Sequence, residues 1–210
     1  MKREQKNIRS KSKIFQSAIH EFGSKDYMSA SINNICNDNN ISKGLIYHYY
    51  ESKDELFLLC VKECFDQLSD YLNRNSTIHH NDVEKSIESY FVARYEFFNV
   101  NEEFRQIFCD AILQTPEHLR KQIAELKEGF DSVNKRFLGE ILKQLNLREN
   151  ISADEAMEYF LAFQEFFNSY FQKNKSRDNH MSDMMKTHEI QLHKIFNILL
   201  YGIAKQEDKK

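Results

Sequence analysis

Residues 42–56, which read SKGLIYHYYESKDEL, decide the fold. Ser42 is a preferred N-cap residue, and Gly44 lets another backbone or a phosphate come close to the helix that starts there. That helix is too short to be stable in isolation. A second helix start follows, because Ser52 and Glu55 have the spacing of a capping box. The stretch therefore predicts a short helix, a break and the capped start of a longer helix.

The segment before it predicts a second short helix. Residues 31–41 read SINNICNDNNI, and Ile32 and Ile35 fall on one face of a helix. Asn40 occupies the turn that follows, and Asn tolerates a left-handed backbone better than other non-glycine residues. Two short helices joined by a tight turn form a helix-turn-helix, which presents its second helix to the major groove of DNA.

Over residues 15–56 this pattern resembles the N-terminal domain of the TetR family of transcriptional regulators. The matching positions are Phe22, Gly23, Ser31, Ile35, Ile41, Ser42, Lys43, Gly44, Tyr47, Tyr49, Tyr50, Ser52, Lys53 and Leu56. The family usually has Thr where Ala30 stands and Gly where Asn40 stands, so one phosphate contact at position 30 is expected to be absent. The resemblance covers the first quarter of the chain.

The resemblance also implies which side chains contact double-stranded DNA. The expected DNA-binding residues are Ser31, Asn33, Ser42, Lys43, Gly44, Leu45, Tyr47, His48, Tyr49 and Lys53. Leu45 suits a thymine methyl group, and Lys43 suits guanine O6 and N7 or a phosphate. Lys53 opposes the helix dipole in the first turn of its helix, a small cost that a bound phosphate would explain.

Charge is distributed unevenly along the chain. Residues 1–53 carry nine Lys or Arg against five Asp or Glu, a balance of +4, and since the 210 residues carry −3 the remainder carries −7. A basic head on an acidic body fits a module that binds a polyanion, although short basic tails are often merely solvated. No segment approaches the roughly twenty apolar residues of a membrane span, and the basic N-terminus has no apolar signal core. We therefore expect a cytoplasmic protein that does not bind membranes.

Apolar residues at helical spacing predict helices along the whole chain. The expected helices are one at 6–22, the two short helices of the motif within 31–41 and after Ser42, and longer ones at 53–73, 82–99, 102–112, 116–145, 154–173 and 183–203. Gly23 is expected to end the first of them as a C-cap. We predict an all-α protein with a three-helix helix-turn-helix domain in residues 1–53. A connecting helix, 53–73, leads to a larger helical domain for effector binding and dimerisation in residues 74–210.

Aromatic residues recur at helical spacing in the second domain. Most are expected to be core, but the family resemblance implies that some line an apolar cavity for a small-molecule effector. The candidates are Phe91, Tyr95, Phe98, Phe104, Phe108, Phe130 and Phe163. Arg94 and Arg105 are the cations nearest to them, so the effector is expected to be largely hydrophobic, with room for one anionic or polar end.

The helices expected at 154–173 and 183–203 are apolar almost all round. A monomer would leave them as a large exposed apolar patch. TetR-like proteins form a four-helix dimer interface from their last two helices, and the resemblance implies the same here. The expected interface residues are Tyr159, Phe163, Phe167, Tyr170, Leu192, Phe196 and Leu199.

The cysteines, at positions 36, 60, 64 and 109, are expected to pack in the core, with redox sensing or a metal site as alternatives. No cofactor motif or catalytic group is readable from the spacings, so an enzyme is not expected. The favoured function is a repressor that a small hydrophobic effector releases from a palindromic operator. The alternative is a helical ligand carrier or interaction protein without operator-specific DNA binding.

Overall fold

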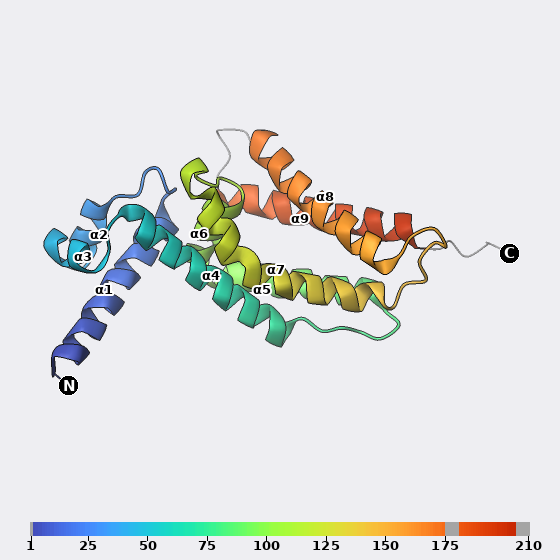
Figure 1. Cartoon of the computed structure of the whole chain (residues 1–210), viewed down its shortest axis with the longest axis horizontal. Coiled ribbons are helices and arrows are strands. Elements are labelled where there is room, and N and C mark those ends of the chain that lie inside the picture. The colour runs from blue at the N-terminus through green and yellow to red at the C-terminus, as the bar shows by residue number, and fades with distance from the viewer. Residues whose placement is uncertain (1, 175–180, 205–210) are drawn as a thin grey trace. The chain divides into compact units, whose positions relative to one another are not determined.

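The computed structural model describes residues 2–174 and 181–204, and this part of the chain consists of helices joined by loops (Figure 1). The α-helices are α1 Lys2–Ser24, α2 Ile32–Asp38, α3 Lys43–Tyr49, α4 Lys53–Asn75, α5 Val83–Val100, α6 Glu102–Ile112, α7 Arg120–Leu142, α8 Ala153–Asn174 and α9 Met181–Ile203, with a 3-10 helix, η1 Glu117–Leu119, before α7. The β-structure of these residues is limited to an isolated bridge between Leu147 and Ala204. The all-α prediction is confirmed.

Serine side chains cap several of these helices, and the cap at Ser42 confirms the sequence prediction. Ser31 and Ser42 cap α2 and α3, each accepting a hydrogen bond from the backbone N–H three residues on, at 3.2 Å. At the start of α8, Ser152 Oγ accepts from the Glu155 N–H at 3.2 Å, and the Glu155 carboxylate accepts from the Ser152 N–H at 2.9 Å. Asn40 has a φ of 52°, so the expected left-handed turn before α3 is also confirmed.

Gly23 does not end α1. The helix continues to Ser24 and the φ of Gly23 is not positive, so the expected C-cap is wrong. The glycine is needed for a different reason: a Cβ at position 23 would lie 2.4 Å from the Cβ of Glu103 on α6. The absence of a side chain therefore permits α1 and α6 to cross closely.

The chain divides into two compact units. The first comprises Met1–Gln67 and Phe98–Glu128, and the second comprises Leu68–Phe97 and Gly129–Lys210. Three helices, α4, α5 and α7, are continuous through this division and contribute residues to both units.

Each unit has its own hydrophobic core. In the first unit the ring of Phe57 on α4 lies 5.2 Å from that of Phe22 on α1 and 4.8 Å from that of Tyr27, measured between centroids. The second core joins α5, α7, α8 and α9. Its buried members are Ile87, Leu138, Ile141, Leu142, Ala156, Phe160 and Leu200.

The cysteines are free thiols, and Cys60, Cys64 and Cys109 are buried, as the core-packing interpretation expected. Burial raises the pKa of the Cys60 thiol, which disfavours the reactive thiolate. Within residues 2–174 and 181–204 no three His, Cys, Asp or Glu side chains are grouped to hold a metal ion. No helix in this part of the chain is long and apolar enough to cross a membrane.

Candidate DNA-binding surface and ligand pocket

Helix α3 is anchored on one face and open on the other. Ile46 is fully buried and holds the helix on the core of the first unit. Lys43, Gly44 and His48 are exposed, and Tyr47 is 50% exposed although it is a large aromatic side chain. The structure thus gathers the residues expected to face the major groove on the outer face of one short helix.

A buried carboxylate on α1 positions the helix-turn-helix. Glu21 Oε1 accepts from the backbone N–H of Ser31 at 3.0 Å, from the Asn34 side-chain amide at 2.8 Å and from Lys25 Nζ at 3.1 Å. Burial works to raise the pKa of Glu21, but the hydrogen bonds from Asn34, Lys25 and Ser31 outweigh it, and the net shift is downward. Glu21 therefore fixes the start of α2 as an ionised acceptor.

The sequence interpretation did not identify Glu21. The available indication was its position, one turn after Ala18 and beside Phe22, where a charge interrupts the apolar face of α1. A carboxylate buried at such a position must be hydrogen-bonded, because an unpaired buried charge is strongly destabilising. Its partners, however, lie in the following loop and helix and cannot be read from spacing.

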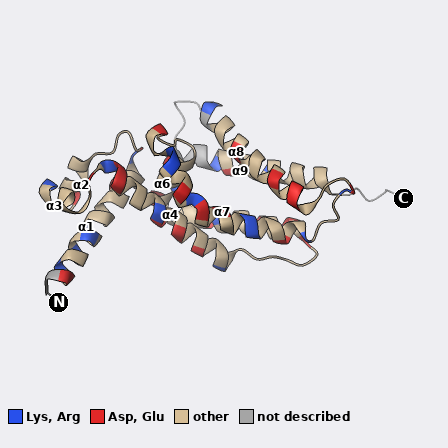
Figure 2. Cartoon of the chain, in the orientation of Figure 1, with Lys and Arg blue, Asp and Glu red and all other residues tan. Residues whose placement is uncertain are grey.

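The other residues expected to bind DNA occupy several environments. Ser31 and Ser42 cap their helices, Asn33 is exposed on α2, and Leu45 on α3 is half-buried. Tyr49, at the end of α3, donates its hydroxyl proton to Asn7 Oδ1 on α1 at 2.9 Å. Figure 2 shows Lys and Arg along α1 and at the start of α3, so α3 and the helix that Tyr49 contacts both carry positive charge.

Lys53 is engaged by the protein itself. Its Nζ donates to the carbonyl oxygens of Tyr27 at 2.8 Å and Ala30 at 3.2 Å, and it lies 4.2 Å from the centroid of the Tyr27 ring. These contacts explain a cation in the first turn of α4 without a phosphate, since the carbonyl dipoles and the ring face stabilise the charge. A phosphate contact by Lys53 stays a prediction.

The same loop is held from α6 and η1. The backbone N–H of Tyr27 donates to the buried carboxylate of Asp110 at 2.9 Å, and the Tyr27 hydroxyl donates to Asp54. His118 of η1 lies 3.1 Å from the other oxygen of Asp54. Burial and the hydrogen bond to Asp54 both raise the pKa of Tyr27. The loop that leads into the helix-turn-helix is therefore fixed in part by residues 83 and 91 positions further along the chain, Asp110 and His118.

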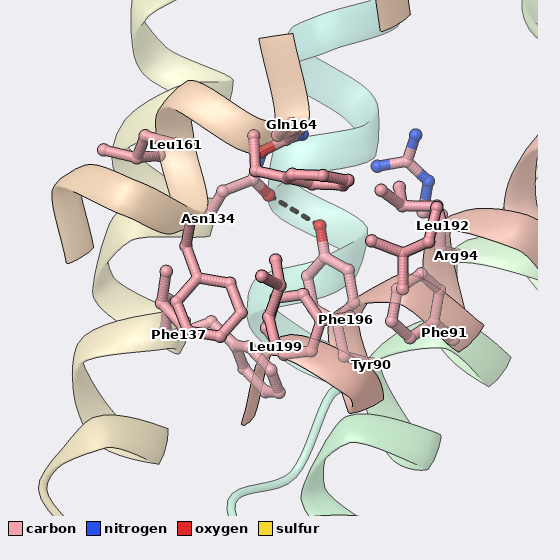
Figure 3. A pocket seen from close by; sticks show the side chains of 14 residues that line it. Tyr90, Phe91, Arg94, Asn134, Phe137, Leu161, Gln164, Leu192, Phe196 and Leu199 are labelled. Atoms are coloured by element: carbon pink, nitrogen blue, oxygen red, sulfur yellow. Dashed lines mark hydrogen bonds between the residues drawn. The ribbon is translucent and has the colours of Figure 1, made fainter. Parts of the chain in front are cut away.

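The second unit contains a pocket of about 60 Å³ between α5, α7, α8 and α9 (Figure 3). Ten of its fourteen lining residues are Phe, Leu or Ile, and the remaining four are Tyr90, Arg94, Asn134 and Gln164. This is the composition of a small-molecule site, in which an apolar wall carries a few polar groups.

Phe91 and Phe163 are the predicted effector residues that line this pocket. The others, which do not line it, are Tyr95, Phe98, Phe104, Phe108 and Phe130. Phe98 and Phe108 pack against each other in the first unit, with centroids 5.0 Å apart, and Tyr95 is 58% exposed. Phe130 is buried, 5.5 Å below the guanidinium of Arg94.

The residues predicted for the dimer interface fall into three groups: some line the pocket, one is buried and two are exposed. Those that line the pocket are Phe163, Leu192, Phe196 and Leu199. Phe167 is buried against the ring of His188, with centroids 5.1 Å apart. Tyr159 and Tyr170 are more than half exposed on α8. Further exposed apolar side chains on the same two helices are Phe166, Ile190, Ile198 and Tyr201.

The polar end of the pocket is a buried network. Arg94 is 3% exposed, and its Nε lies 2.7 Å from Glu189 Oε2. Burial works to raise the pKa of Glu189, but the charge of Arg94 and the hydrogen bond and charge of His188 outweigh it, so the net pKa is lowered. Tyr90 donates its hydroxyl proton to Asn134 Oδ1 at 2.6 Å.

Family models match both parts of the chain. Residues 14–60 match the model described as bacterial regulatory proteins, tetR family, and residues 81–204 match the model described as Tetracyclin repressor-like, C-terminal domain. The chain is 28% identical over 134 residues to the biofilm operon icaADBC HTH-type negative transcriptional regulator IcaR of Staphylococcus epidermidis, which covers 63% of this chain and 68% of that protein. IcaR of Staphylococcus aureus is also 28% identical, over 135 residues that cover 62% of this chain and 70% of that protein.

Solved structures have the same fold. A transcriptional regulator from Cytophaga hutchinsonii superposes with a TM-score of 0.65 at 16% identity, covering 91% of this chain and 97% of that one. The transcriptional regulator FadR from Bacillus subtilis, solved in complex with stearoyl-CoA, superposes with a TM-score of 0.60 at 13% identity, covering 91% of this chain and 98% of that one.

Proposed function

Because this chain belongs to the TetR family of bacterial transcriptional regulators, we propose that it is a repressor that leaves a palindromic operator when a small, largely hydrophobic molecule binds its second unit. The observation that carries the proposal is α3, which buries Ile46 and exposes Lys43, Tyr47 and His48. The negative regulators among its relatives support repression over activation. Such a protein would act in the cytoplasm, where its DNA lies.

Operator recognition follows from the exposed face of α3. Lys43, Tyr47 and His48 would read base edges in the major groove, while the basic side chains of α1 and Asn33 of α2 would contact phosphates. In a homodimer the two α3 helices would enter successive major grooves about 34–36 Å apart, and the operator would be a palindrome.

We place the dimer interface on the exposed faces of α8 and α9. Tyr159, Phe166 and Tyr170 recur at helical spacing on α8, each more than half exposed, and Ile198 and Tyr201 do the same on α9. Exposed apolar side chains that recur on one helix face mark a contact surface for another protein chain. The interface proposed here keeps Tyr159 and Tyr170 of the original seven candidates, because the other five are covered within the chain or line the pocket.

Release requires a ligand that favours one arrangement of the helices over another. The pocket of about 60 Å³ is smaller than the engineered cavity of about 150 Å³ that holds benzene. A larger ligand would therefore displace the helices that line it. Helix α7 supplies Asn134, Phe137 and Leu138 to the pocket. It directly follows η1, and His118 of η1 contacts Asp54 at the start of α4. Movement of α7 would thereby reach the loop that holds the helix-turn-helix.

The proposal is tested with a matched pair of tyrosines. Tyr47→Ala removes an exposed ring from α3, and Tyr95→Ala removes a similarly exposed ring from α5. We expect Tyr47→Ala to weaken binding to a duplex from the regulated promoter by about 5- to 150-fold, the value of one base contact, at an unchanged melting temperature. Tyr95→Ala should change neither quantity.

Fluorescence anisotropy at several salt concentrations separates the alternatives. A specific regulator prefers its operator over random DNA at every salt concentration, and a ligand that couples to it by about 1–3 kcal/mol lowers operator affinity about 5- to 150-fold. Equal affinity for operator and random DNA throughout would instead favour the ligand carrier or interaction protein.

A further inference from the structure

Two polar residues of the pocket are joined by a hydrogen bond that orients one of them. Arg94 is held by Glu189, with its Nε 2.7 Å from Glu189 Oε2. Tyr90 donates its hydroxyl proton to Asn134 Oδ1 at 2.6 Å. Figure 3 shows this last bond, with Asn134 reaching from α7 toward Tyr90 on α5.

The hydrogen bond from Tyr90 fixes the orientation of the Asn134 amide. Because the amide oxygen accepts from Tyr90, the amide nitrogen is left with two N–H donors. That nitrogen is inaccessible to solvent and has no hydrogen-bond partner among residues 2–174 and 181–204. A buried donor without a partner is both uncommon and destabilising, so one at the wall of a pocket indicates a missing acceptor.

Charge decides what kind of acceptor fits. Arg94 is already balanced by Glu189, and Asn134 contributes only the dipole of a neutral amide. His188, the other ionisable group in contact with Glu189, does not line the pocket. A carboxylate buried at Asn134 would lack a counter-charge and would be strongly disfavoured, whereas a carbonyl oxygen needs only the donor that is present.

We propose that the pocket binds an uncharged, mainly apolar molecule through a carbonyl oxygen, such as a ketone, ester or lactone, that accepts a hydrogen bond from Asn134. This inference rests on the proposed role of the pocket as the effector site. The Phe and Leu walls contribute the apolar contacts, and Asn134, oriented by Tyr90, selects the carbonyl group.

Three six-carbon probes test the inference by direct calorimetric titration of the full chain without DNA. Hexan-2-one carries the carbonyl, hexane lacks it, and hexanoate replaces it with a carboxylate. We expect hexan-2-one to bind roughly three- to tenfold more tightly than hexane, the value of one hydrogen bond between neutral groups, and hexanoate to bind most weakly. If hexan-2-one and hexane bind equally, the amide holds a water molecule only and the inference is overturned; tightest binding by hexanoate also overturns it.

Three variants test whether Asn134 is the source of the preference for hexan-2-one over hexane. Asn134→Leu keeps the side-chain shape and removes both donors, so hexan-2-one should lose its advantage while hexane binds as before. Asn99→Leu makes the same change at an exposed position of α5 and should keep the preference. Tyr90→Phe frees the Asn134 amide to rotate and should reduce the advantage, which gives a second test if Asn134→Leu fails to fold. A preference that survives both pocket variants overturns the inference.

Operator titration then separates this inference from the proposed function. If hexan-2-one binds through Asn134 without changing operator affinity, the ligand class stands and the proposed release mechanism fails. If hydrophobic molecules release the operator with no preference for a carbonyl, the release mechanism stands and the ligand class is wrong.

Discussion

Gly44→Ala should make the free protein more stable and the repressor weaker. Gly44 is the second residue of α3, and a Cβ built there meets no atom within 4 Å. Alanine is favoured over glycine by about 0.8–1.0 kcal/mol in a helix interior, and less in the first turn. We therefore expect the free energy of unfolding to rise by about 0.5–1 kcal/mol, and the melting temperature by about 1–4 °C for a chain of this length.

Although Gly44→Ala should stabilise the free protein, it should weaken its binding to DNA. If the backbone of α3 approaches the DNA closely at Gly44, the added methyl group must displace the helix start, and the neighbouring contacts of Lys43 and Tyr47 lengthen. Loss of one or two such contacts corresponds to about 1–3 kcal/mol, or a 5- to 150-fold weaker operator complex. No substitution that merely damages the fold gives higher stability together with lower affinity.

Calorimetry without DNA and anisotropy with labelled operator measure the two quantities. Gly129→Ala is the matched control, because Gly129 lies in α7 and a Cβ there also meets no atom within 4 Å. It should raise the melting temperature similarly and leave operator affinity unchanged. If Gly44→Ala binds the operator as tightly as the wild type, α3 does not approach the DNA closely at this residue. If its melting temperature falls, the added methyl group must meet neighbouring atoms, and the space at Gly44 is not open.

Three further changes test the scaffold. Glu21→Gln should lower the free energy of unfolding by about 1–3 kcal/mol near neutral pH. The pKa of Glu21 in the folded protein is below its usual value of 4.5, so ionised Glu21 stabilises the wild type above pH 4.5. This stabilisation is lost as the pH falls through the lowered pKa. Urea unfolding should therefore show that the free energies of unfolding of the wild type and of Glu21→Gln approach each other in acid. Light scattering should show that Phe166→Glu converts the proposed dimer into a helical monomer, and a dimer that survives the change would place the interface elsewhere. Gly23→Ala should destabilise the protein by about 1–3 kcal/mol through overpacking against Glu103, and an unchanged melting temperature would show that α1 and α6 can separate without cost.

The sequence by itself determined the local structure of the helix-turn-helix. Ser42 caps α3, as predicted, because a cap needs only a hydroxyl three residues before a backbone N–H. Asn40 forms the turn because its own backbone tolerates a positive φ. These are interactions within a few residues, so spacing and residue type suffice to predict them.

Only the tertiary structure decided what each helix face meets. Helical spacing placed Phe98 and Phe163 in one set of aromatic residues, yet Phe98 packs in the first unit and Phe163 lines the pocket of the second. A period of 3.6 residues shows which side chains share a face, but the neighbour of that face comes from a distant part of the chain. Glu21 and Asn134 illustrate the same limit: their burial and their hydrogen bonds depend on which helices pack around them, and only folding brings those helices together.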